Sequence, residues 1–182
     1  MKILKEIFEW IIVLVVSVAL YFLINTFVAS NFSVKGHSMD YTFADNDKVI
    51  VSKVNKIDRG DTIVFHANAN DDYIKRVIGM PGDTIEYKND TLYINGKKQD
   101  EPYLDEKKKE FKKESSENLT PDFNIEFLRS TTAKTVPADS YFVMGDNRRN
   151  STDSRAFGFV KKDKVIGQVV LRFYPFKSVK TF

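Results

Sequence analysis

The run Gly-His-Ser-Met at residues 36–39 contains a hydroxyl that could act in hydrolysis. The hydroxyl of Ser38 is a weak nucleophile by itself and needs a nearby base to take its proton. Gly36 permits a sharp bend or the close approach of another chain beside that serine. Serine beside glycine usually marks only a turn, so Ser38 becomes a candidate because it follows a long apolar run within a few residues.

A lysine in the strand-like run at residues 73–79 is the candidate base. Alternate side chains of a strand share a face, so Lys75 would lie between Tyr73 and Val77. Burial there would lower the pKa of the amine from about 10.4 toward neutrality, and a neutral amine can accept a serine proton. Taken alone, this run favours an exposed lysine whose charged end reaches water.

A dense polar run at residues 145–155 is the third candidate segment, and it is typical of a hydrogen-bonded loop. Its Asp153 and Arg155 are spaced to brace such a loop. A Ser-His-Asp triad is the competing arrangement, and geometry decides it. His37 adjoins the serine and cannot easily reach its hydroxyl while also meeting a carboxylate, and His66 fits better at a strand end.

Composition excludes several classes of protein. The 182 residues include 28 basic and 25 acidic side chains, and this small excess of +3 argues against a nucleic-acid partner. The absence of cysteine excludes a disulfide scaffold, a cysteine nucleophile, a thiolate zinc site and an iron–sulfur cluster. Two histidines are too few for a histidine-rich metal site. The sequence therefore predicts neither a metal nor a cofactor.

An apolar segment near the N-terminus predicts a membrane-spanning helix. No charged residue lies between Trp10 and Val34, and 17 of the first 20 positions are apolar. A helix needs about 20 such residues to cross the hydrocarbon core. The small residues at 28–30 could mark a cleaved signal peptide, but the run exceeds the roughly 7–15 apolar residues of such a peptide. We therefore predict an uncleaved anchor at residues 10–30.

The charges beside this segment predict its orientation. Lys2 and Lys5 precede it, which favours a cytoplasmic N-terminus at residues 1–9, while Lys35 on the far side weakens that bias slightly. The remainder would then lie outside the cytoplasmic membrane as a single-pass protein in contact with the lipid bilayer. Its length of about 150 residues suits one domain.

Beyond the anchor, the pattern changes to short strands separated by turns. Runs rich in Val, Ile, Phe and Tyr predict strands at residues 48–54, 62–67, 73–78, 84–87, 91–94, 140–144 and 165–174. Short strands spaced in this way favour a mostly β fold, an antiparallel sheet that curls or closes, over alternating helices and strands.

A small lobe is expected as an insertion within this β domain. Residues 89–136 form the predicted lobe, and residues 31–88 and 137–182 form the main β catalytic domain. The stretch at 97–113 has seven lysines against five acids and little apolar content. It favours a solvated loop or ribbon over a basic patch that faces the membrane.

These segments, in this order behind an apolar anchor, resemble the bacterial type I signal peptidases, membrane-bound Ser–Lys proteases. The likeness is closest to the short, single-anchor form of Gram-positive bacteria. The matching residues are Ser38-Met39 with Thr42, Lys75 to Gly79, Pro81-Gly82-Asp83, Asn95-Gly96, Gly145-Asp146-Asn147-Arg148 and Ser151-x-Asp153-Ser154-Arg155. The family's mostly β catalytic domain with a smaller inserted lobe agrees with the strand pattern.

The resemblance implies a role for each matching residue. Ser38 would be the nucleophile, Lys75 the general base, and Ser151 would orient the lysine amine through a hydrogen bond. The backbone N–H of Ser38 would bind the oxyanion, and Gly36 stands close to that site where some relatives supply a serine hydroxyl. Structural roles are implied for four further residues, namely Asp146, Arg76, Asp153 and Arg155.

The implied reaction is removal of signal peptides from exported preproteins after Ala-x-Ala-type sites, through an acyl-enzyme and without metal or cofactor. The signal peptide would add to an edge strand, and the enzyme is expected to work as a monomer. Tyr41 departs from the family, which usually has proline there. It leaves open a catalytically silent, anchored homologue that only binds signal peptides. A soluble, self-cleaving repressor-type relative is disfavoured by the charge-free anchor.

The aromatic tail at residues 171–176 has two possible uses. With Phe32, Tyr41 and Phe43 it could rest on lipid headgroups. Alternation along a strand would instead direct about half of its side chains into the core.

Overall fold

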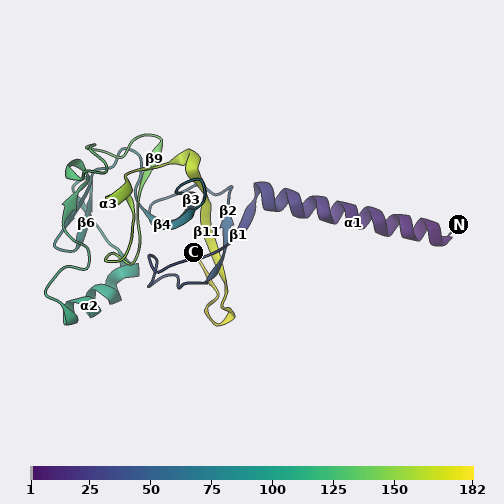
Figure 1. Cartoon of the computed structure of the whole chain (residues 1–182), viewed down its shortest axis with the longest axis horizontal. Helices are drawn as coiled ribbons and strands as arrows, with labels where there is room; N and C mark the ends of the chain where they lie inside the picture. The colour runs from purple at the N-terminus through teal and green to yellow at the C-terminus, as the bar shows by residue number, and fades with distance from the viewer. Residues whose placement is uncertain (1) are drawn as a thin grey trace.

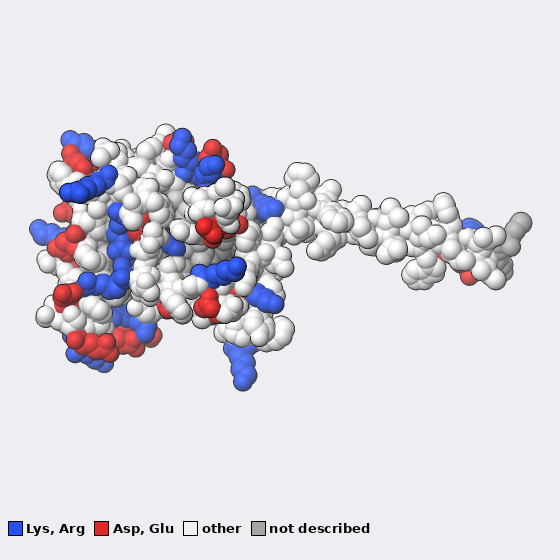
Figure 2. Space-filling view, viewed as in Figure 1, with Lys and Arg blue, Asp and Glu red and all other residues white. Residues whose placement is uncertain are grey.

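The computed structural model describes residues 2–182 as one exposed N-terminal helix joined to a folded β body (Figure 1). The helix α1 (Lys2–Phe27) extends away from this body, and the window Ile3–Phe27 is long and apolar enough to cross a membrane, with a mean hydropathy of 2.6. Figure 2 shows charged side chains over the body and almost none along the helix. A fully exposed apolar helix gains no stabilisation from burial when it stands in water, so α1 suits a lipid environment.

The end of α1 differs from the predicted anchor at residues 10–30. The helix ends at Phe27, and after Val28 the chain enters strand β1 (Ala29–Ser33). Residues 29 and 30 pair with Ser52 and Val51 of the adjacent strand. Sheet pairing therefore determines the boundary, which an apolar count could not reveal.

The larger sheet contains most of the strands. Besides β1, its strands are β2 (Lys48–Ser52), β3 (Thr62–His66), β4 (Asp72–Gly79), β9 (Ser140–Met144), β10 (Val160–Lys161), β11 (Val165–Tyr174) and β12 (Lys180–Thr181). Their order is β1-β2-β11-β3-β4-β9-β10, with β12 on β11, and every pair is antiparallel. The predicted mostly antiparallel β class is confirmed. The sheet is open at β1 and β10 and does not close.

The smaller sheet forms the inserted lobe. Its strands are β5 (Ile85–Lys88), β6 (Thr91–Ile94), β7 (Lys97–Gln99) and β8 (Phe123–Asn124), in the order β7-β6-β5-β8. Since β5 pairs with both β6 and β8, we propose that the lobe begins before the predicted boundary at residue 89.

A helix occupies much of the stretch predicted as a loop or ribbon. Helix α2 (Asp105–Glu114) follows β7 and the turn η1 (Pro102–Leu104). Asp105 and Glu106 lie in its first turn and lysines in its last, an arrangement that the helix dipole favours. None of its residues is buried, so it has no apolar stripe by which the sequence could have revealed it.

The remaining helical elements are single turns. They are η2 (Ile125–Phe127), α3 (Ser154–Phe157), η3 (Lys162–Lys164) and η4 (Phe176–Ser178). Of the aromatic tail, Phe176 is 79% exposed, whereas Val169, earlier in β11, is fully buried. The strand thus enters the core at one end and leaves it at the other.

Three clusters of buried apolar residues surround the large sheet. One contains Met39, Phe43, Val64 and Ile74, and so packs the segment after Ser38 against β3 and β4. A second lies around Ile63 and Val77, and a third around Ile78 and Phe142 joins the sheet to the lobe. Strand β4 contributes to all three clusters, which holds Lys75 rigidly at the centre of the fold.

Candidate active site

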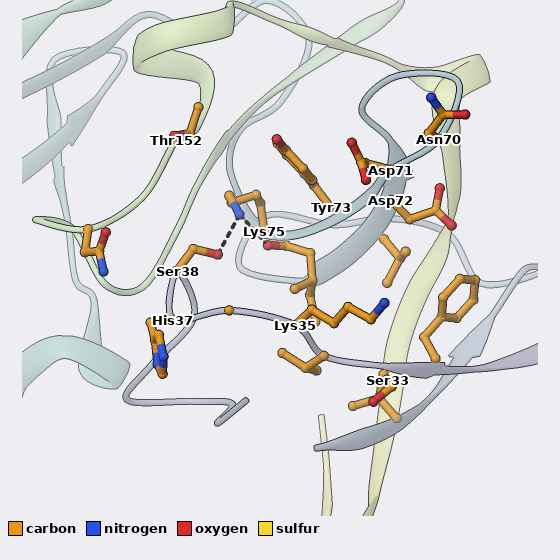
Figure 3. A pocket seen from close by; sticks show the side chains of 17 residues that line it. Ser33, Lys35, His37, Ser38, Asn70, Asp71, Asp72, Tyr73, Lys75 and Thr152 are labelled. Carbon is orange, nitrogen blue, oxygen red and sulfur yellow. Dashed lines mark hydrogen bonds between the residues drawn. The ribbon is translucent and has the colours of Figure 1, made fainter. Parts of the chain in front are cut away.

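The side chains of Ser38 and Lys75 meet at one end of a cleft (Figure 3). Lys75 Nζ donates a hydrogen bond to Ser38 Oγ at 2.7 Å and another to the carbonyl oxygen of Ile74 at 3.0 Å. The two residues are 37 positions apart in the sequence. A base within about 3 Å of a hydroxyl is the arrangement that an activated nucleophile requires.

Burial changes the chemistry of the Lys75 amine. The residue is only 4% exposed. Desolvation lowers the pKa of Lys75 from 10.5 to about 8, although the carboxylates of Asp153 and Asp146 act to raise it. The amine also lies over the ring of Tyr73, 5.2 Å from its centroid. A useful fraction of this lysine is therefore neutral near physiological pH.

The backbone around Ser38 is held by contacts on both sides. Met39 is fully buried, and its carbonyl oxygen accepts hydrogen bonds from the N–H groups of Thr42 and Phe43. On the other side, Asn147 N–H donates to the Ser38 carbonyl oxygen at 3.0 Å. The serine is thus presented on a fixed turn, with its side chain half-buried at the rim of the cleft.

A buried ion pair lies directly behind this turn. Arg76 donates from Nε to Asp146 Oδ1 at 2.8 Å and from Nη2 to Asp146 Oδ2 at 2.6 Å. Asp146 is fully buried and Arg76 is 8% exposed. Thr42 Oγ1 donates to the same carboxylate at 2.5 Å, which ties the turn after Ser38 to β4 and to the loop that follows β9.

Asp153 and Arg155 form a second bidentate pair. Arg155 Nε and Nη2 each donate to the Asp153 carboxylate at 2.8 Å. Burial favours the neutral acid, but the hydrogen bond and charge of Arg155 outweigh it and hold the pKa of Asp153 below its ordinary value. The carboxylate also accepts from the N–H of Gly145 at 3.0 Å, so this pair fixes the loop beside the nucleophile.

The hydrogen bond expected from Ser151 to the lysine amine is absent. Within residues 2–182, Ser151 Oγ is buried and has no hydrogen-bond partner. The Lys75 amine is turned toward Ser38 Oγ and its own strand instead. Ser151 packs against Gly145, where an added Cβ would lie 2.2 Å from Ser151 Oγ and 2.4 Å from the Ser38 carbonyl oxygen. That close approach at Gly145 was not predicted from the sequence.

Gly36 provides a bend and no close approach. Its φ is +81°, and a Cβ built there would meet no atom within 4 Å. Of the two uses expected of this glycine, the structure forms the sharp bend, and the space beside it stays open on the exposed rim. Its N–H donates to Asp45 Oδ1 at 2.7 Å.

The two histidines do not form a triad with the serine. His37 Nδ1 pairs with Asp40 Oδ2 at 3.1 Å, and His66 Nδ1 pairs with Asp72 Oδ1 at 2.6 Å. Among the described residues, neither imidazole contacts Ser38 Oγ. In the same part of the chain, no cluster of three or more acidic or histidine side chains could hold a metal ion.

The cleft itself has a volume of about 610 Å³. Apolar side chains from Phe32, Val49 and Val64 form part of its lining. Asp71 and Asp72 line it as well, at the start of β4 (Figure 3). A cleft with a mixed polar and apolar lining and the Ser–Lys pair at one end suits an extended peptide, whose small side chains can contact the apolar part of the lining.

The family described as signal peptidase, peptidase S26, has a model that matches residues 7–174. The chain belongs to this signal peptidase family. Signal peptidase IB of Staphylococcus aureus (strain COL) is 46% identical over 182 residues, which cover 97% of this chain and 94% of that relative. Signal peptidase I of Bacillus caldolyticus is 49% identical over 167 residues, which cover 90% and 89%.

A solved signal peptidase has the same fold. The crystal structure of a signal peptidase I from Enterococcus faecalis V583 matches with a TM-score of 0.58 and 47% identity, covering 63% of this chain and 97% of that one. With these relatives, the chain is a serine peptidase that removes signal peptides, and the silent homologue is not favoured. The apolar helix α1 agrees with the membrane anchoring of signal peptidases.

Tyr41, the departure from the usual signal peptidase proline, has a distinct backbone. Its φ is 93°, which a proline ring fixed near −65° cannot adopt. The ammonium of Lys107, on α2, lies over its ring at 4.9 Å from the centroid. This signal peptidase therefore shapes the turn after its serine differently and supports it from the inserted lobe.

Proposed function

We propose that Ser38 is the nucleophile and Lys75 the general base of the signal peptidase reaction. The observation that carries the proposal is the 2.7 Å contact between Lys75 Nζ and Ser38 Oγ, with the lysine buried. Burial keeps a share of the amine neutral, and the contact places that amine where it can accept the serine proton.

The reaction then proceeds through an acyl-enzyme. Ser38 Oγ attacks the scissile carbonyl carbon while Lys75 takes the hydroxyl proton, and the carbonyl electron pair moves onto oxygen. The Ser38 N–H faces that developing oxyanion and stabilises it. The Lys75 ammonium next gives its proton to the leaving amine as the peptide bond breaks. The regenerated amine finally activates a water, which hydrolyses the ester and releases the serine.

The signal peptide would bind as an extended strand along the cleft. Its edges come from residues 32–36, at the end of β1 and just beyond it, and from the start of β4 at residues 72–75. Backbone hydrogen bonds to such edges supply affinity, while alternate side chains contact the apolar part of the lining at Phe32, Val49 and Val64. We therefore propose cleavage sites of the Ala-x-Ala type. When the substrate backbone is hydrogen-bonded close to the wall of the cleft, small side chains fit between that backbone and the wall.

The proposed topology is a single pass with the N-terminus in the cytoplasm. Lys5 precedes the apolar segment of α1, and the body that follows carries the Ser–Lys pair. The exposed rings of Tyr174 and Phe176, near η4, would then meet the lipid headgroups outside the membrane. We also expect the enzyme to act as a monomer.

Replacing each of the two residues separately tests the proposal. We expect Ser38→Ala and Lys75→Ala to abolish cleavage of a preprotein by the full chain in detergent, measured as release of the mature protein. Ser116→Ala and Lys88→Ala change an exposed serine and an exposed lysine of the lobe and serve as matched controls. Normal processing by either site variant would refute the assignment.

A further inference from the structure

One residue holds two consecutive carbonyl groups of the nucleophile turn. Asn147 Nδ2 donates to the His37 carbonyl oxygen at 2.9 Å, and Asn147 N–H donates to the Ser38 carbonyl oxygen at 3.0 Å. The His37 carbonyl belongs to the same peptide group as the Ser38 N–H. The side chain of Asn147 therefore holds the peptide unit that carries the proposed oxyanion donor.

The planarity of the peptide bond turns this contact into a constraint on direction. In a trans peptide the C=O and N–H bonds point in opposite directions within one rigid plane. Fixing the His37 oxygen on the Asn147 side thus aims the Ser38 N–H away from Asn147. Among residues 2–182 that N–H has no hydrogen-bond partner, so it is free for a ligand. A hydrogen bond accepted by the carbonyl also polarises the peptide and strengthens its N–H as a donor.

We propose that Asn147 is a positioning residue that aims the Ser38 N–H at the oxyanion. The proposal rests on the assignment of Ser38 as nucleophile. Gly36 has no side chain, so at the position where some relatives carry a hydroxyl this chain supplies no second donor. The direction of the Ser38 N–H therefore matters more here than in a site with two donors.

The loop that carries Asn147 is rigid enough for this role. Asp146, the preceding residue, is fully buried in its ion pair with Arg76. Arg148, the following residue, donates from Nη2 to Glu101 Oε1 at 2.6 Å, and both side chains are almost completely buried. Two buried ion pairs thus fix the backbone on either side of Asn147.

Among residues 2–182, one weaker contact could replace the Asn147 side chain. The N–H of Asp40 also donates to the His37 carbonyl oxygen, but at 3.3 Å. That bond lies within the turn itself and would move with it. Removal of the Asn147 amide should therefore loosen the peptide plane without unfolding the loop, since the backbone contact to Ser38 remains.

Asn147→Asp is the sharpest test, because it keeps the size of the side chain and replaces the donor with an acceptor that repels the His37 oxygen. Asn147→Ala removes the amide without adding charge. Asn124→Asp is the matched control, because Asn124 caps η2 through its Oδ1 and an aspartate can do the same. All three are compared with wild type as the full chain in detergent.

The kinetics separate positioning from a general structural effect. Removing an oxyanion donor outright lowers kcat by about 10²–10³-fold, so misdirecting one should cost roughly 10- to 100-fold with KM nearly unchanged. A peptide aldehyde ending in Ala-x-Ala provides a second measurement. Ser38 Oγ bonds to its carbonyl carbon, the serine proton passes to Lys75, and the former carbonyl oxygen becomes an oxyanion at the Ser38 N–H. Its affinity should fall by the same factor as kcat, while the affinity of the product peptide should not change.

Three results would overturn the positioning role. One is kcat of both Asn147 variants within twofold of wild type. Another is a parallel loss of product-peptide affinity or a lowered melting temperature, which would indicate a structural role. The third is a fall in kcat without loss of aldehyde affinity. Ser38→Ala, assayed alongside, separates the two proposals. If Ser38→Ala still cleaves, the assignment of Ser38 as nucleophile fails. If Ser38→Ala is inactive while Asn147→Asp is fully active, only the positioning role of Asn147 fails.

Discussion

A change of pH across the pKa of Lys75 should control the rate of cleavage. Burial lowers this pKa from 10.5 to about 8. At pH 7 about a tenth of such amines are neutral, against about three in ten thousand for an unperturbed lysine, a difference of roughly 300-fold. We expect kcat/KM to rise about tenfold per pH unit below pH 7 and to level off above about pH 8 to 9.

The assay uses the full chain in detergent with a quenched fluorescent peptide that contains an Ala-x-Ala site. Lys75→Arg is the control, because a guanidinium stays charged at every accessible pH. It should be inactive throughout, with no rise toward alkaline pH. A profile that is flat between about pH 6 and 9, or one that keeps rising toward pH 10.5, would refute the buried-amine argument. Activity of the arginine variant would refute the role of Lys75 as base.

The same pKa shift makes a prediction about stability. Because the folded pKa is lowered, the unfolded chain binds more protons between about pH 8 and 10.5, and stability rises with pH across that window. Below pH 8 the buried ammonium imposes its full cost, about 3 kcal/mol for a shift of this size. Lys75→Met removes that cost but loses two hydrogen bonds of about 1 kcal/mol each. The variant should therefore be more stable than wild type by about 1 kcal/mol at pH 7.

The advantage of Lys75→Met should vanish near pH 9 and become a deficit of about 1 kcal/mol near pH 10, because most of the cost of the ammonium is then gone while the two hydrogen bonds of the neutral amine remain. Thermal unfolding at two pH values measures it, since about 1 kcal/mol shifts the melting temperature of such a chain by about 2–4 °C. An advantage of the same size at pH 7 and near pH 10 would contradict the linkage.

Three further substitutions test the surroundings of the pair. Asp146→Ala leaves the Arg76 guanidinium buried without a counter-charge and should destabilise the fold by about 3–5 kcal/mol. The measurement is a lowered melting temperature, and an unchanged melting temperature would contradict the prediction. Gly145→Ala places a Cβ 2.4 Å from the Ser38 carbonyl oxygen and should lower kcat more than about tenfold while the fold persists. A kcat within twofold of wild type would show that the turn at Ser38 can shift to accommodate the added Cβ. Tyr41→Pro restores the residue usual in the family but cannot adopt a φ of 93°, so kcat/KM should fall well below that of Tyr41→Gly; equal activity of the two would remove the backbone argument.

The strands could be predicted from sequence because each carries its own signal. The expected range 165–174 coincides with β11 and the range 91–94 with β6, since β-branched and aromatic runs end there at turn residues. Helix α2 could not be found in this way, because it buries nothing and has no periodic apolar face. Its contact with the turn after Ser38, through Lys107 over the Tyr41 ring, is tertiary and leaves no local signal in the sequence.

The site was only partly visible in the sequence. Alternation placed Lys75 beside Tyr73 and Val77, but its burial depends on strands β3 and β9, which flank β4 in the sheet. The resemblance implies structural roles for Arg76, Asp146, Asp153 and Arg155, and the structure joins these four residues into two ion pairs, Arg76–Asp146 and Asp153–Arg155. The contact of Asn147 with the nucleophile turn was missed, because no local pattern shows which carbonyl a loop amide will reach.

The connection between helix and site limits how far from the membrane the enzyme could cut on the proposed topology. Only Val28 separates α1 from β1, and Lys53 Nζ donates to the carbonyl oxygens of Asn25 and Thr26 at 3.0 Å each, which caps the end of the helix. Eleven residues from Phe27 to Ser38 span at most about 36–40 Å even when extended. On the proposed topology, the catalytic pair is therefore held at a fixed, short reach from the membrane surface. A signal peptide whose apolar segment lies in the same bilayer would present its cleavage site near that height, so on this topology we expect position along the membrane normal to contribute to specificity together with the proposed small side chains.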